Sequence, residues 1–369
     1  MPDPTFVYVG TYTDPIRFGT GQVLQGKGRG IHIYRFDHAT GELTEAGVAE
    51  RVVNPSYLAF DPARRFLYAV NEMKEFQGKV GGAVSAFRID PLTGGLGFLN
   101  IKATHGTDPC HLMVDRQGRC VLVANFASGS VCVLPINPDG SLGDASDVIQ
   151  HEGSSVHPTR QTSPHAHAIE IDAANRFVFV PELGLDKVMI YELDSARGKL
   201  SPNPRQPFVT VKPGAGPRQL VMHPNGRFAY LINELDSTIT AYRYDPATGR
   251  LEDIVTVPTL PSDFSSVSTC AEVQVAPSGK FLYGSNRGHD SIVVYAIDEG
   301  SGSLTLVGHE DTRGRIPRNF AISPTGAFLA VANQDSNNLV LFRVDPGSGH
   351  LTQLGREIRV GTPVCVRFF

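Results

Sequence analysis

The chain contains no tryptophan and only five cysteines among its 369 residues. An odd number of cysteines without a C-x-x-C pair argues against a disulfide framework, and the missing tryptophan excludes the Trp-Asp signature of one large class of repeat proteins. No apolar run approaches the roughly 20 residues that a membrane-spanning helix needs. The opening residues, MPDP, lack the basic and apolar regions of a signal peptide. We therefore expect a soluble cytoplasmic protein with reduced thiols.

The chain also lacks a strong excess of either charge, with a formal net charge of −4 and an isoelectric point near 6.3. A dedicated nucleic-acid binder usually presents a strongly basic face, so we expect neither nucleic acid nor membrane as a partner. A locally basic pocket for a small anionic molecule is compatible with this balance. Hydrophobic residues make up 41% of the chain, which is enough for a large core.

One hairpin pattern recurs along the chain. It begins with Pro and an apolar-rich strand, continues with a polar turn such as Gly-Arg-Phe, and ends with a second apolar strand that stops near Asn. The copies start about 50 residues apart, which is the period of a propeller blade. Six copies begin at Pro55, Pro109, Pro164, Pro217, Cys270 and Pro317.

A second hairpin pattern alternates with the first. It consists of an alternating strand, then Asp, a short turn with Gly, and Leu, which together are typical of a β-hairpin. Seven copies begin at Gly30, Gly82, Gly129, Asp186, Ser237, Asp290 and Asn338.

The two termini supply the first-pattern copy that the count lacks. The chain ends in PVCVRFF, which resembles a first strand, and opens with TFVYVG, which resembles a second strand. Closing the ring in this way leaves no open sheet edge. We therefore predict an all-β fold in which residues 1–369 form one seven-bladed β-propeller domain. Each blade has four antiparallel strands, and the last blade is closed by the N- and C-terminal strands.

Residues that depart from the repeat are candidates for function. The start of the first strand and the end of the second lie at the same end of an antiparallel hairpin. Because the first strand of a blade lines the central channel, we expect these positions to meet at one mouth. For any single residue, a salt bridge at the rim explains the charge as well as a catalytic role does. The whole set of residues, however, favours a ligand site. The set comprises His111, His165, His167, Arg218, Glu234, Glu272, Arg287 and Arg318, with Glu72 and Glu182 nearby.

Two of these histidines raise the question of a metal. His165 and His167 lie on one face of a strand, because side chains repeat every two residues. A zinc site, however, needs three or four ligands in a defined geometry. The other candidates are acidic or basic residues from separate blades. We expect no metal and no cofactor, and full activity without added metal.

At these residues the chain resembles the lactonase family of seven-bladed propellers, which includes bacterial 6-phosphogluconolactonase. The resemblance covers essentially the full length, and it extends to fungal carboxy-muconate lactonizing enzymes. It rests on the segments YVGTYT from Tyr8, NPSYL from Asn54, PCHL from Pro109, RQ from Arg160, PHAH from Pro164, PGAGPR from Pro213, NRGHD from Asn286 and PRNF from Pro317.

The resemblance implies an active site of one histidine, two arginines and one glutamate in the channel mouth. By position these roles fall on His167, Arg218, Glu234 and Arg287, with His165 an equal alternative for the histidine. We expect the substrate-binding residues to be His111, His165, Glu182, Glu272 and Arg318.

Three functions fit these residues. The first is a lactonase that hydrolyses a sugar lactone, with 6-phosphogluconolactone as the expected substrate. Glu234, Glu272 or a histidine would activate water, and Arg218 and Arg287 would hold a phosphate or carboxylate. The second is an isomerase that closes a carboxylated muconate to its lactone, and the third is a non-catalytic scaffold. The charged mouth argues against the scaffold.

Overall fold

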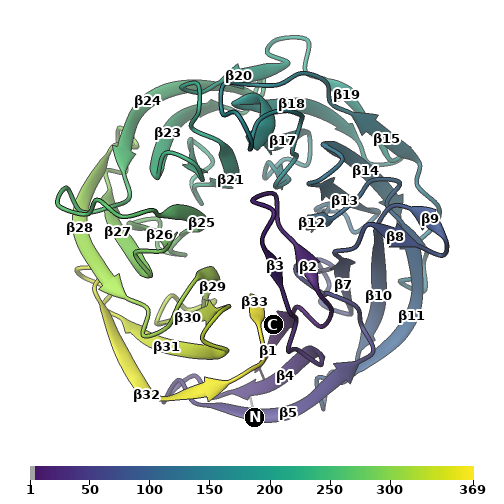
Figure 1. Ribbon diagram of the computed structural model, residues 1–369, viewed down its shortest axis with the longest axis horizontal. Helices are drawn as coiled ribbons and strands as arrows, with labels where there is room; N and C mark the ends of the chain where they lie inside the picture. The colour runs from purple at the N-terminus through teal and green to yellow at the C-terminus, as the bar shows by residue number, and fades with distance from the viewer. Residues whose placement is uncertain (1–4) are drawn as a thin grey trace.

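Alternating apolar residues give this chain its strands, and the strands assemble into seven antiparallel sheets arranged as a ring (Figure 1). The structure is a computed structural model that describes residues 5–369, apart from the side chain of residue 356. The predicted all-β, seven-bladed propeller is confirmed. The opening segment MPDP lies outside the described residues.

The innermost strand of each blade lines the channel. These strands are β33 (Pro363–Phe368), β6 (Leu58–Phe60), β12 (Pro109–Val114), β16 (Glu170–Ile171), β21 (Pro217–Met222), β25 (Thr269–Val275) and β29 (Pro317–Ile322). The second strands are β1 (Thr5–Thr11), β7 (Phe66–Asn71), β13 (Cys120–Asn125), β17 (Phe177–Glu182), β22 (Phe228–Asn233), β26 (Phe281–Arg287) and β30 (Phe328–Asn333).

The outer half of each blade is the second hairpin of the repeat. Its inner strands are β4 (Gly30–Phe36), β10 (Ala83–Ile89), β14 (Ser130–Pro135), β18 (Lys187–Asp194), β23 (Thr238–Asp245), β27 (Ser291–Ile297) and β31 (Asn338–Val344). Its outer strands are β5 (Leu43–Glu50), β11 (Leu96–Ala103), β15 (Asp147–Gln150), β19 (Lys199–Pro202) with β20 (Phe208–Thr210), β24 (Arg250–Pro258), β28 (Leu304–Asp311) and β32 (Leu351–Arg359).

Three short elements stand outside this scheme. They are the hairpin of β2 (Ile16–Arg17) and β3 (Val23–Leu24), the hairpin of β8 (Glu75–Phe76) and β9 (Lys79–Val80), and the 3₁₀ turn η1 (Leu183–Leu185).

The chain termini close the ring as predicted. Strand β1 pairs with β33 on one side, with Val7 opposite Phe368, and with β4 on the other. The sheet order is therefore β33-β1-β4-β5, and the first blade is shared by the two ends of the chain.

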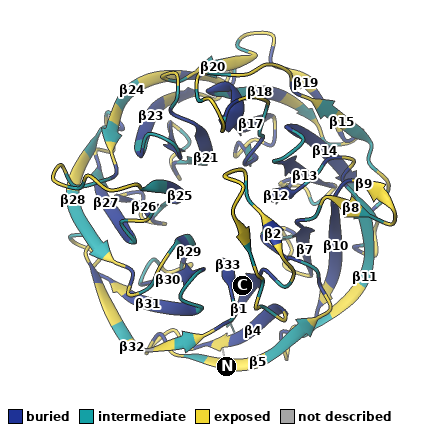
Figure 2. Cartoon of the chain, in the orientation of Figure 1, coloured by how far each residue is buried: buried dark blue, intermediate teal, exposed yellow. Residues whose placement is uncertain are grey.

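The core lies between neighbouring blades, where the inner strands are buried and the outer strands reach solvent (Figure 2). A recurring hydrogen bond joins one blade to the next. The buried hydroxyl of Tyr8 donates to the carbonyl oxygen of Gly94 at 2.8 Å, and Tyr283 donates to Gly349 at 2.9 Å. Both glycines have a positive φ, which explains why the turn of the second hairpin requires glycine. Among the described residues, no helix is long and apolar enough to cross a membrane.

Candidate active site

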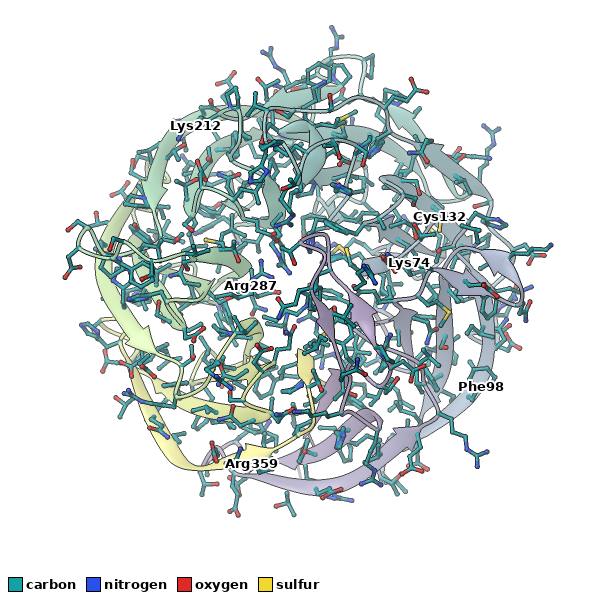
Figure 3. The ribbon with its side chains drawn as sticks, in the orientation of Figure 1. Lys74, Phe98, Cys132, Lys212, Arg287 and Arg359 are labelled. Carbon is teal, nitrogen blue, oxygen red and sulfur yellow. The ribbon has the colours of Figure 1, made fainter. Side chains whose placement is uncertain are left out.

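A cavity of about 390 Å³ opens at one mouth of the channel. Its walls come from separate blades and from the β2–β3 hairpin, and Figure 3 shows Arg287 pointing from its blade toward the centre of the ring. The titratable groups on its walls are Arg17, Glu72, Lys74, Asp108, Cys110, Arg160, His165, His167, Glu234, Arg287, Arg318 and Asp335.

A β-bulge at the start of the innermost strand directs one residue of a blade toward this mouth. In the sheet of β21 and β22, Pro217 pairs with Asn233 and Gln219 with Ile232, so Arg218 is the extra residue. Bulges of this kind re-aim a side chain. The same irregularity singles out Cys110 in β12 and Arg318 in β29.

His167 occupies this bulge position in its own blade. Ala166 bridges to Glu182, and Glu170 pairs with Phe179, which leaves one extra residue on the inner strand. His167 therefore corresponds to Arg218, although it stands three residues after its proline and Arg218 stands only one.

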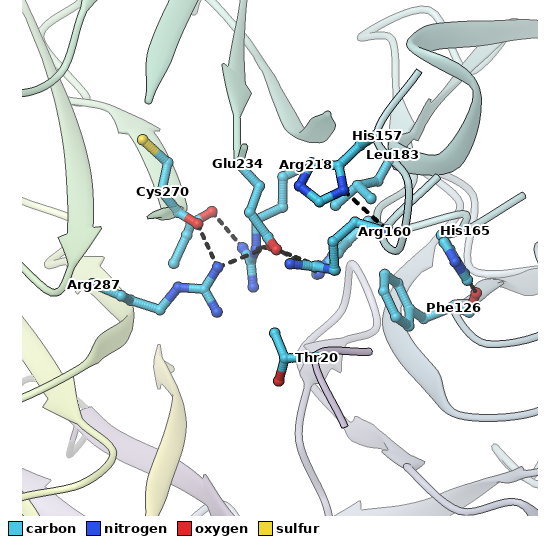
Figure 4. Close-up of polar contacts among 12 residues, drawn as sticks. Thr20, Phe126, His157, Arg160, His165, Leu183, Arg218, Glu234, Cys270 and Arg287 are labelled. Atoms are coloured by element: carbon cyan, nitrogen blue, oxygen red, sulfur yellow. Dashed lines mark hydrogen bonds and ion pairs between the residues drawn. The ribbon is translucent and has the colours of Figure 1, made fainter. Parts of the chain in front are cut away.

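Glu234 is the centre of an ion-pair cluster (Figure 4). Its Oε1 atom lies 2.5 Å from Arg160 Nη2, and its Oε2 atom lies 2.9 Å from Arg287 Nη2 and 3.2 Å from Arg218 Nε. The Nε2 atom of His167 is 3.9 Å from the same Oε2 atom. One buried carboxylate thus holds three guanidinium groups that come from three parts of the chain.

The cluster fixes the charge of Glu234. Burial alone would raise the pKa of this carboxyl group, but Arg287, Arg160, His167 and Arg218 outweigh burial and hold its pKa well below the usual range. Glu234 is therefore a carboxylate throughout the neutral range. A carboxylate with such a low pKa is a poor acceptor for a proton, so its first role here is that of a counter-ion.

His167 is neutral in the unliganded site. Burial, together with the positive charge of Arg218, holds the pKa of its imidazole well below 6.5. The thiol of Cys110 donates to the main-chain oxygen of His167 at 3.2 Å, while the Cys110 sulfur lies 3.8 Å from His167 Nδ1. The two ring nitrogens of His167 thus face different groups, Nδ1 the Cys110 sulfur and Nε2 the Glu234 carboxylate.

The cavity carries more positive charge than its carboxylates neutralise. Burial and then, as a smaller effect, the neighbouring arginines lower the pKa of Arg287 to about 10, although Glu234 opposes them. The Nε atom of Arg287 is buried and has no hydrogen-bond partner among the described residues. Five cationic side chains line the cavity, against four carboxyl groups. The cations are Arg17, Lys74, Arg160, Arg287 and Arg318, and the carboxyl groups are Glu72, Asp108, Glu234 and Asp335. Guanidinium groups bind carboxylate and phosphate in a fork-like geometry, so the cavity suits an anion.

Glu72 is a buried carboxyl group on the same cavity wall. Burial raises the pKa of its carboxyl group, although Arg318 lies close enough to oppose the shift. The carboxyl Oε2 atom accepts a hydrogen bond from the Tyr12 hydroxyl at 2.9 Å.

The structure brings together His165, His167, Glu234, Arg287 and Arg318 on the cavity wall, with Arg218 directly behind Glu234. His165 lies at the side of the cavity, where its ring stacks on Phe126 at a centroid distance of 4.7 Å. Its Nδ1 atom is 3.0 Å from the Phe126 carbonyl oxygen.

His111 and Glu272 do not lie on the wall of this cavity. They face a second cavity of about 550 Å³ at the opposite side of the channel. Both residues directly follow the bulge position, which places them one step further down the channel. Glu272 accepts hydrogen bonds there from the side-chain amides of Gln219 at 2.8 Å and Asn319 at 2.5 Å. The expectation that these two residues line the mouth cavity is corrected, although both line a smaller space together with Arg218 and His167.

Glu182 is also misplaced in the sequence prediction. It is the last residue of β17 and pairs with Lys187, as Asn233 pairs with Thr238, so it takes the place of Asn233 in the repeat and not that of Glu234. Its carboxylate is fully buried, lies 2.6 Å from His151 Nδ1, and accepts the main-chain N–H of His165. It supports the His165 segment and does not line the cavity.

Two parts of the site were not predicted from the repeat. Arg160 comes from the loop between β15 and β16, and the β2–β3 hairpin comes from the connection after β1. Neither has a counterpart in the repeat, so comparison of blades gives no signal for them. Within the described part of the chain, no group of three or more His, Cys, Asp or Glu residues is arranged to hold a metal ion.

A propeller with a cationic cavity at one channel mouth is the architecture of a small-molecule enzyme or receptor. The chain belongs to the family "Lactonase, 7-bladed beta-propeller", whose model matches residues 6–368. It is 37% identical over 313 residues to a 6-phosphogluconolactonase of Bacillus subtilis, covering 85% of this chain and 83% of that protein. A 6-phosphogluconolactonase of Formosa agariphila is 33% identical over 324 residues, covering 86% of each chain.

A solved structure gives the same result. The periplasmic gluconolactonase of Pseudomonas aeruginosa superposes with a TM-score of 0.90 at 36% identity and covers 99% of both chains. The predicted family is therefore confirmed, while the cytoplasmic location of this chain stays a prediction.

Proposed function

We propose that this protein hydrolyses a sugar lactone and that 6-phosphogluconolactone is its substrate. The observation that carries the proposal is the cluster of Arg160, Arg218 and Arg287 around the single carboxylate of Glu234, on the wall of a cavity of small-molecule size. Three guanidinium groups share one counter-ion there, and a bound anion would supply the missing negative charge. The named relatives support the choice of a phosphorylated sugar lactone.

His167 is the best candidate for the general base. In the proposed step, Nε2 accepts a proton from water as the water oxygen attacks the lactone carbonyl carbon. The carbonyl oxygen becomes an oxyanion that a cavity guanidinium stabilises. The tetrahedral intermediate then expels the ring oxygen, which takes the proton back from His167 and becomes a hydroxyl group. The new carboxylic acid loses its remaining proton to solvent and becomes a carboxylate. A bound phosphate raises the low pKa of His167, because negative charge favours the imidazolium form.

Glu234 has a supporting role in this scheme. Its carboxylate orients Arg160, Arg218 and Arg287 before the substrate arrives, so that no reorganisation is needed when the oxyanion forms. This assignment differs from the sequence-based hypothesis that Glu234 moves the proton, and it follows from the low pKa of Glu234.

The test is hydrolysis of freshly prepared 6-phosphogluconolactone, followed by proton release in weak buffer. Unphosphorylated gluconolactone is followed in the same way, and a carboxy-muconate is followed by proton uptake, because closing a carboxylate onto a double bond consumes a proton. We expect turnover of the phosphorylated lactone with a higher kcat/KM than for gluconolactone. Turnover of the carboxy-muconate alone would replace the proposed function by lactone formation, and turnover of none of the three would refute it.

A further inference from the structure

The connection after β1 departs from the repeat more than any other connection at this mouth. In most blades the link between the second and third strands is a tight turn with a residue of positive φ, such as Asp186 or Asn337. After β1 the link is instead residues 12–29 and contains the β2–β3 hairpin. The short links are residues 126–129, 183–186, 234–237, 288–290 and 334–337.

A long connection in a compact fold requires a reason, because its ordering costs conformational entropy. The base of this hairpin is anchored, since Ile16 is buried against Tyr12 and Val364. Its tip is not buried: residues 19–23 are exposed, although they belong to a well-defined turn in which Phe18 N–H donates to the Gln22 carbonyl oxygen at 2.9 Å. The tip thus adds little core and instead forms part of the cavity wall.

The tip spans the mouth of the cavity. On one side, the Phe18 ring lies 5.6 Å from the Arg318 guanidinium and 6.0 Å from the Tyr12 ring. On the other side, a Cβ added to Gly19 would be in ordinary van der Waals contact with Arg160 Nε and the Phe126 ring, at 3.5 Å from each. Figure 1 shows the hairpin reaching over the centre of the ring, and Figure 4 shows Thr20 facing the ion-pair cluster of Glu234.

We propose that residues 18–22 determine substrate size: they bridge the mouth between Arg318 and Arg160 and restrict the cavity to single-ring anionic lactones. This inference deepens the proposed function and rests on it for the identity of the substrate. The volume of about 390 Å³ lies at the small end of ligand cavities, and the hairpin tip is one of its walls. Phe18 has a second effect, because its cation–π contact holds the Arg318 guanidinium at the cavity wall.

The main test variant replaces residues 18–22 by the dipeptide Asn-Gly. Arg17 and Val23 are a residue pair of the β2–β3 ladder, so a two-residue turn connects them without disturbing the anchored base. A milder variant is Phe18→Ala. Its matched control is Phe76→Ala in β8, which belongs to the other inserted hairpin and does not line the cavity.

Access to the cavity is measured without any substrate, by labelling Cys110. Of the five cysteines in the described residues, Cys110 lines this cavity, and peptide mapping separates it from the others. Two methanethiosulfonate reagents are compared, one with a methyl group and one with a polyethylene glycol chain. The short-turn variant should react with the large reagent at least about tenfold faster than the unmodified protein, with little change for the small one. Equal rates for the large reagent in both proteins would overturn the inference.

Selectivity is measured as the ratio of kcat/KM for 6-phosphogluconolactone to that for the lactone of a phosphorylated disaccharide. The ratio should fall by about tenfold in the short-turn variant and by less in Phe18→Ala, with Phe76→Ala unchanged. An unchanged ratio in an active short-turn variant would also overturn the inference. If no form of the protein hydrolyses a lactone, the proposed function fails, and the labelling rates alone decide whether the hairpin controls access.

Discussion

The change of Glu234 to Gln tests whether this residue is the counter-ion of the site. The substitution keeps the shape of the side chain but removes the charge that faces Arg160, Arg218 and Arg287 at 2.5 to 3.2 Å. A single ion pair about 4 Å apart is worth about 4 kcal/mol at an effective dielectric constant of about 20. Removing one partner of a buried pair typically costs about 3–5 kcal/mol, because the other charge stays buried. We expect Glu234→Gln to lose about 3–5 kcal/mol of unfolding free energy at pH 7.

The matched control is Glu50→Gln. Glu50 pairs with Arg29 at 2.6 Å, as closely as Glu234 pairs with Arg160, but both side chains are more than half exposed. Solvent screens such a pair, so its loss should leave stability nearly unchanged. The measurement is urea denaturation of the three proteins, each with and without inorganic phosphate. Because phosphate replaces part of the lost negative charge, it should stabilise Glu234→Gln more than the unmodified protein.

The contribution of Glu234 to stability should depend on pH, in the direction that its lowered pKa determines. The pKa of Glu234 is lower in the folded protein than in the unfolded chain. Its contribution to stability is therefore complete above the unfolded pKa of about 4.3 and is lost as the pH falls through the folded pKa. The stability difference between the unmodified protein and Glu234→Gln should be constant from neutral pH down to about 5 and should shrink below about 4. Equal stability of the two proteins at pH 7 would refute the counter-ion role.

Four further predictions concern the chemistry. His167→Gln should lower kcat by about 10²–10⁴ with the fold retained, and His165→Gln should lower it much less. Because the pKa of His167 is lowered, the pH–rate profile of the unmodified protein should show a constant kcat/KM to well below pH 6.5. Arg218→Ala should mainly raise KM, and Arg218→Lys should restore binding only in part, since a point charge lacks the planar fork; normal kinetics in both would remove Arg218 from the site. Glu272→Gln should leave kcat/KM nearly unchanged while lowering the melting temperature, because Glu272 faces the opposite cavity. Activity should survive prolonged chelation, and loss reversed by one divalent ion would show a metal requirement.

The positions of Glu272 and His111 show what a comparison of the blades predicts and what it does not. The sequence identified which residues follow the first proline of each blade, and these residues do line the channel. It did not reveal the bulge. The bulge directs Cys110 and Arg318 toward one mouth and places the residues that follow them deeper in the channel. A bulge depends on hydrogen bonds between two strands, so no single strand sequence specifies it.

The sequence by itself determined the architecture. Apolar alternation with a period of two, glycine turns and seven copies of one pattern leave few other ways to bury the apolar faces, and the split copy fixes how the ring closes. These are local properties, repeated often enough that one weak copy does not matter. Family membership was likewise visible in ordered segments along the chain.

Only the tertiary structure decided the site. Glu182 is the last residue of its strand and Glu234 directly follows its own, and this offset of one residue makes the first a buried support and the second the centre of the arginine cluster. Arg160 and the β2–β3 hairpin reach the mouth from connections that carry no repeat signal. The physical reason is that charge and hydrogen-bonding partners are set by distances of a few ångströms between blades far apart in sequence, whereas each blade is specified by its own local pattern.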